Sequence, residues 1–210
     1  MNFSKRLLLT FIILLVPISF FAHPHIIIDY SVELRVNSQG VPEGYYVTWL
    51  FDSFFSQEVI FEVDRNRDGI LQPNEVQMVY SFAFENTRHF NYFTRFQINQ
   101  EPMVAVTRVE QFDARIENRQ LWYRFFVPFD ANGSRTTANT AKINVWVFDE
   151  TFFSAFLPLD PPFVENSQQN SQFTVSTFRD TNTVIVFDPT DMGLTTSRTH
   201  PDVVQFVRRQ

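Results

Sequence analysis

The chain has 210 residues, a formal net charge of −6 at pH 7 and no cysteine. The length suits one domain, or at most two small ones. Without cysteine the chain cannot form disulfides, thiolate metal sites, a thiol nucleophile or a lipoprotein anchor, and its acidic balance argues against nucleic acid or an anionic membrane as a partner.

The first 22 residues have the layout of a secretory signal peptide. Lys5 and Arg6 precede an apolar run over residues 7–16, and Ala22 is a small residue that suits cleavage. The run is too short to span a bilayer. We therefore predict a periplasmic protein that is exported through a cleaved signal and does not span the membrane after cleavage. An uncleaved anchor is the alternative.

Cleavage after Ala22 leaves His23-Pro24-His25 as the new N-terminus. In an extended backbone the two imidazoles lie on one face about 7 Å apart, close enough to chelate one ion. Imidazole suits nickel, zinc or copper better than calcium, so we predict a transition-metal site at His23 and His25. The alternative is a pair of exposed polar residues. His89 and His200 could complete a site only through the fold.

Two strands and a short helix are predicted next. Residues 26–36 and 45–51 are rich in β-branched and aromatic side chains, which favours strands. Asp52 then follows as the N-cap of a helix that runs to Val63. A second helix is predicted from Pro73 to about residue 90, because its apolar residues recur at helical spacing.

Between these helices, residues 64–75 read DRNRDGILQPNE. Side-chain oxygens fall at positions 1, 3, 5 and 12 of this segment and a glycine at position 6, which is the pattern of an EF-hand calcium loop. Gly69 permits the positive φ that wraps the chain around an ion. The predicted calcium ligands are Asp64, Asn66, Asp68, the carbonyl of Ile70, Gln72 directly or through water, and Glu75.

Two features of this loop predict weak binding. Arg65 and Arg67 place cations beside the ion, and EF-hands usually occur in pairs, whereas the sequence holds no second loop. We therefore expect a Kd of roughly 10⁻⁴ to 10⁻³ M. The alternative is a polar turn between two helices that binds nothing.

Beyond Asn91 the pattern changes to short strands separated by turn signals, which are predicted at 92–98, 103–116, 121–129, 142–148, 173–178 and 183–187. We predict a mainly β protein of the α+β class. Its single β-sandwich-like domain would cover residues 23–187, with a helix–calcium loop–helix insert at about 52–90. Residues 188–210 are predicted to be a loosely attached tail.

Signatures of common enzyme classes do not occur in the sequence. It contains no G-x-S-x-G elbow, H-E-x-x-H helix, phosphate-binding P-loop or dinucleotide fingerprint. We therefore predict that the chain is not an enzyme. One enzymatic alternative is a copper oxidase that holds its metal through the amine and imidazole of His23, with a third nitrogen ligand from the fold.

A signal peptide followed by HPHIIIDYSVEL, VTWLFDSFF, the calcium-type loop and VWVFDETFFSAF resembles a family of exported proteins of uncharacterised function. Members are described as periplasmic components of an ABC-type transport system and occur beside, or fused to, nickel/cobalt permeases. The resemblance implies an accessory protein whose partner is an inner-membrane metal permease or ABC-type transporter. It also implies that His23 and His25 handle the metal and that residues 64–75 form a calcium clip.

Because the chain lacks the size of a two-lobed substrate-binding protein, an adaptor or metallochaperone fits the resemblance better than a solute receptor. The candidate metals are calcium in the loop and nickel, cobalt, zinc or copper at the histidines. A structural alternative is a calcium-stabilised β-sandwich module that binds another envelope protein and has no transport role.

Overall fold

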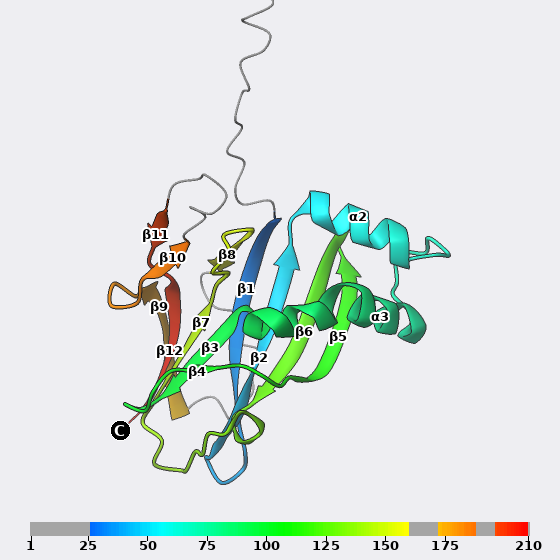
Figure 1. Ribbon diagram of the computed structural model, residues 1–210. Helices are drawn as coiled ribbons and strands as arrows, with labels where there is room; N and C mark the ends of the chain where they lie inside the picture. Colours follow the sequence, from blue (N-terminus) through cyan, green and yellow to red (C-terminus); the bar gives the residue numbers. More distant parts are fainter. Residues whose placement is uncertain (1–25, 160–171, 188–195, 210) are drawn as a thin grey trace, which may run out of the picture.

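The structure is a computed structural model that describes residues 26–159, 172–187 and 196–209 (Figure 1). The predicted signal peptide and His23 and His25 lie outside the described residues. The described chain is mainly β, and its sheets pack as a sandwich with one inserted helical region. The predicted fold class is therefore confirmed.

The first sheet has five strands in the order β5-β6-β2-β1-β8. Their bounds are β1 Ile26–Val36, β2 Pro42–Phe51, β5 Glu110–Glu117, β6 Gln120–Pro128 and β8 Ser154–Pro158. Neighbouring strands are antiparallel except β8, which runs parallel to β1. Inward-facing residues alternate with outward-facing ones along β1 and β2, as expected for a sheet with one buried face.

The second sheet also has five strands, in the order β4-β3-β7-β12-β9. Their bounds are β3 Thr94–Ile98, β4 Val104–Ala105, β7 Lys142–Val147, β9 Phe173–Arg179 and β12 Asp202–Arg208. A separate pair is formed by β10, Ile185–Phe187, and β11, Ser197–Thr199. The 3-10 turn η3 covers Asp130–Asn132.

The inserted region joins the two sheets. It consists of α2, Ser53–Val63, then α3, Pro73–Val79, the π-helix η1, Tyr80–Phe84, and the 3-10 helix η2, Glu85–Phe93. Figure 1 shows α2 and α3 on one face of the first sheet. Of the second helix predicted from Pro73 to about residue 90, only the part up to Val79 is a regular α-helix, because a π-helix and a 3-10 helix follow it. Its last turns are kinked, because Asn91 and Tyr92 have φ values of 54° and 51°.

An aromatic core links these parts. The ring of Trp49 lies 5.0 Å from that of Phe125 in the first sheet, 5.9 Å from Phe84 in η1 and 5.5 Å from Phe156 in β8, measured between centroids. Tyr45 meets Phe96 of the second sheet at 6.0 Å. The abundance of phenylalanine, 26 residues, thus supplies core contacts in a protein without disulfides.

The structure corrects two predictions about strands and adds one strand that was not predicted. The tail is not loosely attached, because β12 lies within the second sheet and pairs with both β7 and β9. The strand predicted at 103–116 is two strands, β4 and β5. Strand β8 was not predicted at all. Both β8 and β12 pair with segments far away in the sequence, which local patterns do not show.

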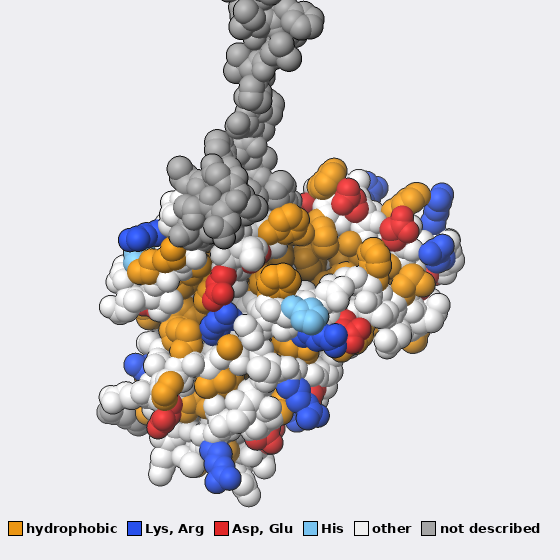
Figure 2. Space-filling model, in the orientation of Figure 1, with side chains coloured by type: hydrophobic (Ala, Val, Ile, Leu, Met, Phe, Trp, Pro, Cys, Tyr) orange, Lys and Arg blue, Asp and Glu red, His pale blue; other side chains and the backbone are white. Residues whose placement is uncertain are grey.

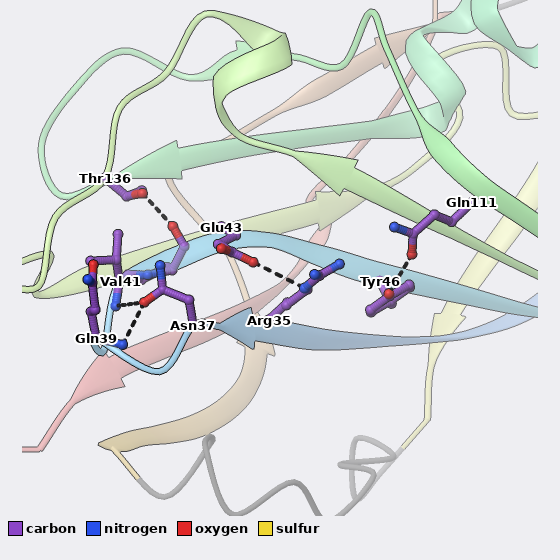
Figure 3. A network of polar contacts seen from close by, with 9 residues as sticks. Arg35, Asn37, Gln39, Val41, Glu43, Tyr46, Gln111 and Thr136 are labelled. Carbon is purple, nitrogen blue, oxygen red and sulfur yellow. Dashed lines mark hydrogen bonds and ion pairs between the residues drawn. The ribbon is translucent and has the colours of Figure 1, made fainter.

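The hairpin between β1 and β2 holds the C-terminal strand in place. Within the turn, the Oδ1 of Asn37 accepts hydrogen bonds from the backbone N–H groups of Gln39 and Val41, both at 3.0 Å (Figure 3). The guanidinium of Arg208, at the end of β12, donates to the carbonyl of Gly40 at 2.7 Å. This contact ties the C-terminus to the first hairpin.

Asp52 is the N-cap of α2, as predicted. Its Oδ1 accepts hydrogen bonds from the N–H groups of Phe54 and Phe55 at 2.9 and 3.0 Å, while its Oδ2 accepts one from the N–H of Ile27 at 3.0 Å. One carboxylate therefore fixes both the start of α2 and the start of β1.

We expect Asp52→Ala to lower the free energy of unfolding by about 1–3 kcal/mol, since it removes a helix cap and a charge-assisted bond to β1. Urea unfolding of the two proteins measures the difference. Asp52→Asn, which retains a capping oxygen, should recover about half of the loss. A loss below about 0.5 kcal/mol for Asp52→Ala would contradict the double role.

Candidate calcium-binding loop

The loop at residues 64–75 is held between two anchored helices. Near the start of α2 the buried Ser56 donates to the carbonyl of Phe51 at 3.2 Å and accepts from the N–H of Leu121 in β6 at 2.9 Å. Together with the Asp52 cap, this contact fixes α2 on the first sheet. At the other side of the loop, Pro73 opens α3, where its fixed φ is already helical.

Asp64, the first predicted ligand, lies at the base of the loop and is only 5% exposed. Its Oδ1 accepts a hydrogen bond from the N–H of Asp68 at 3.2 Å, and its Oδ2 accepts one from the N–H of Gly69 at 3.0 Å. The loop thus folds back over the carboxylate. Gly69 has a φ of +76°, as predicted, so a side chain there would be strained.

The next two predicted ligands interact with each other. Asn66 Oδ1 accepts from the N–H of Asp68 at 3.2 Å, and the amide of Asn66 donates to Asp68 Oδ2 at 2.8 Å. The other oxygen of Asp68 accepts from the N–H of Ile70 at 2.8 Å. These short-range bonds turn the side-chain oxygens toward the loop backbone. A bound cation would compete with the amide of Asn66 for Asp68.

Glu75, the last predicted ligand, closes the loop from the first turn of α3. Its Oε1 accepts from the N–H of Arg65 at 3.1 Å, and its Oε2 accepts from the N–H of Gln72 at 2.9 Å. The carboxylate is 4% exposed. It therefore joins the two ends of the loop across ten residues of sequence.

The two buried carboxylates, Asp64 and Glu75, have no ion-pair partner among the described residues. Burying an ionised carboxylate is costly unless charge or hydrogen bonds compensate it, and here the compensation comes from backbone N–H groups. Arg67, one of the two nearby cations, instead directs its guanidinium over the ring of Phe61 at 5.7 Å. The donor types at these positions, carboxylate, amide and carbonyl oxygens, are those that a hard cation such as Ca²⁺ prefers.

The loop carboxylates do not already form a tight cluster. Within the described ranges, no group of three or more His, Asp or Glu side chains is close enough to hold a metal ion. Coordination would therefore require Asp68 and Glu75 to exchange backbone hydrogen bonds for the ion. The carbonyl of Ile70 and the side chain of Gln72 would supply further oxygens.

The two described histidines lie on separate elements. His89 is an exposed residue of η2 whose Nε2 accepts a 3.4 Å hydrogen bond from Arg88. His200 precedes β12, and its Nδ1 lies 2.8 Å from the carbonyl oxygen of Thr183. His23 and His25 lie outside the described residues, and His89 and His200 each contact a different part of the fold.

Sequence reasoning missed a polar hollow on the outer face of the first sheet, with a volume of about 310 Å³. Glu33 and Arg124 both line it. The guanidinium of Arg124 pairs with Glu33 at 2.6 Å and lies 3.8 Å from the ring centre of Tyr46. Polar residues alternating along β1 and β6 are a signal for this face, but their register becomes visible only once the strands are paired.

Comparison with protein-family models identifies the family of the chain. The model of DUF1007, a protein family of unknown function, matches residues 8–183, well over half of the sequence. The chain belongs to the DUF1007 family. The described residues of this DUF1007 protein contain no helix that is long and apolar enough to cross a membrane.

No curated protein matches this DUF1007 chain. Among solved structures, an acetylcholine-binding protein, type 1, from Biomphalaria glabrata is similar over 100% of both chains, with 9% sequence identity and a TM-score of 0.38. A TM-score this low carries no argument about function.

Proposed function

We propose that this DUF1007 protein is a periplasmic accessory protein of a transition-metal transport system and that it binds calcium in the loop at residues 64–75. The observation that carries the calcium proposal is the pair of buried carboxylates, Asp64 and Glu75, at the two ends of a loop with EF-hand spacing. The transport role rests on the resemblance described above and on the exported His-Pro-His terminus.

In this proposal the calcium ion has a structural role. The loop joins α2, which is fixed to the first sheet, to α3, which leads through η1 and η2 into β3 of the second sheet. An ion bound to both ends of the loop would stiffen the connection between the two sheets. The ion would hold the loop in one conformation, as in weak extracellular calcium modules, and would not signal a change in calcium concentration as it does in sensor proteins.

Calcium is expected to stabilise the folded protein. An ion that binds only the native state at a hundredfold excess over its Kd adds about 2.7 kcal/mol to the free energy of unfolding. For a domain of this size that corresponds to a rise in Tm of about 5–10 °C. Melting curves in calcium and in chelator measure this shift.

Glu75→Gln is the matched variant, because it keeps the size of the side chain and one hydrogen-bond acceptor while removing the charge. The shift should vanish in this variant, and magnesium should produce a much smaller shift in the unsubstituted protein. The calcium proposal fails if the two proteins respond equally to calcium, or if neither responds.

The proposed transition-metal site has its own test. Protein that begins at His23 is titrated with Ni²⁺, Co²⁺, Zn²⁺ and Cu²⁺, and compared with His23→Ala/His25→Ala. We expect the variant to bind more weakly, because imidazole is the ligand that these ions prefer among the side chains at that terminus. Equal affinity in both proteins would remove the proposed handling role.

The second candidate function is a calcium-stabilised interaction module of the cell envelope without a transport role. It is favoured by the placement of the loop between two helices that contact the sheets, since this placement needs no second metal. A large calcium shift together with no transition-metal binding would select this candidate.

A further inference from the structure

The solvent-facing side of α2 carries two exposed aromatic rings. Phe54 and Phe61 are each 70% exposed, and their spacing of seven residues places them on the same side of the helix. Glu58 lies between them at helical spacing and Glu62 follows, both exposed. We call these four residues the outer face of α2. Figure 2 shows hydrophobic and acidic side chains alternating over this helix.

The opposite side of α2 is fixed against the core. Ser56, Val59 and Val63 are buried, and the N-terminus of the helix is held by the Asp52 cap. The helix therefore cannot rotate to bury Phe54 and Phe61 without breaking these contacts. Their exposure is a consequence of the fold, and it leaves two large apolar side chains in water, where burial by a partner would be favourable.

The charge on this face discriminates between classes of partner. Among the described residues, neither Glu58 nor Glu62 forms an ion pair. Two unpaired carboxylates would repel a membrane of anionic lipids and would attract a basic surface. A contact between a cation and this face already occurs within the chain, since the guanidinium of Arg67 lies 5.7 Å from the ring centre of Phe61.

We propose that the outer face of α2 binds a basic amphipathic segment of a protein partner. Apolar side chains of the segment would pack on Phe54 and Phe61, and its Lys or Arg residues would pair with Glu58 and Glu62. A helix packing along α2 meets all four residues, because they share one side of the helix over little more than two turns. This interaction does not depend on calcium binding or on the histidines.

A synthetic amphipathic helix of lysine and leucine is a suitable probe, and a glutamate and leucine peptide of the same pattern is its charge-reversed counterpart. Binding to protein that begins at His23 is measured by fluorescence anisotropy at several salt concentrations. We expect the lysine peptide to bind at least tenfold more tightly than the glutamate peptide. Phe54→Ser/Phe61→Ser should weaken lysine-peptide binding at least tenfold, and Glu58→Gln/Glu62→Gln should both weaken it and reduce its salt dependence.

The matched control is Phe178→Ser/Glu101→Gln. It removes an exposed ring from β9 and, near β3, an exposed charge that forms no ion pair within the described part of the chain, both outside α2, and should change binding less than twofold. Equal losses in the control and the α2 variants would overturn the proposal. Binding to phosphatidylglycerol vesicles through Phe54 and Phe61 without binding to the lysine peptide would also overturn it, since the face would then belong to a membrane.

Discussion

A chain that ends at His200 is expected not to fold. This truncation removes β12, which lies between β7 and β9, so that β9 loses its hydrogen-bonded neighbour in the sheet and β7 keeps only β3. It also removes three buried apolar side chains, Val203, Val204 and Phe206, each worth about 1.5–3 kcal/mol on burial. Since a domain is stable by only about 5–15 kcal/mol, this loss, together with that of the hydrogen bonds made by β12, is comparable to the whole stability of the fold.

The measurement is the near-UV circular dichroism and the thermal unfolding curve of the truncated protein. We expect no cooperative transition and no fixed aromatic signal. The matched control ends at Arg208, which keeps β12 and the contact with Gly40, and should melt within a few degrees of the full chain. Cooperative melting of the shorter chain would show that the C-terminal strand is dispensable.

Trp49→Ala is the substitution with the largest expected effect on the core. The side chain is 1% exposed, and its ring contacts η1, β6 and β8 through Phe84, Phe125 and Phe156. Replacing a buried tryptophan by alanine leaves a cavity and costs about 3–5 kcal/mol. Because Phe84 belongs to the segment that follows the loop at residues 64–75, the cavity should also loosen the insert on the first sheet.

Urea unfolding measures this loss, and Tyr45→Phe is the control in the same core. The hydroxyl of Tyr45 is buried without a hydrogen-bond partner among the described residues, and burial raises the pKa of this phenol well above its usual value. Removing an unpaired buried hydroxyl should leave stability unchanged or slightly higher. A Trp49→Ala loss below about 1 kcal/mol would mean that the aromatic contacts do not hold the insert.

Features that depend on neighbours in the sequence were predictable. Asp52 caps α2 because its carboxylate reaches N–H groups two and three residues ahead, and Gly69 has a positive φ because the loop must turn there. The β-sandwich-like fold also followed from short strands with regular turns. These predictions rest on local geometry, which the sequence specifies directly.

Features that depend on distant pairing were not predictable. β12 reads DVVQFVR within a polar stretch, and its place in the sheet is set by β7 and β9, which lie far from it in sequence. The outer face of α2 was not predictable from the sequence for a related reason. Its four residues share a helix pattern with the buried ones, and only the packed structure shows which side is covered.

Calorimetric titration of calcium into protein that begins at His23 tests the account most directly. We predict one site with a Kd of roughly 10⁻⁴ to 10⁻³ M, and no binding in Glu75→Gln or Asp64→Asn. No heat of binding up to roughly tenfold above that range, or the same binding in the variants, would contradict the account, since the loop would then be a polar turn that holds no ion.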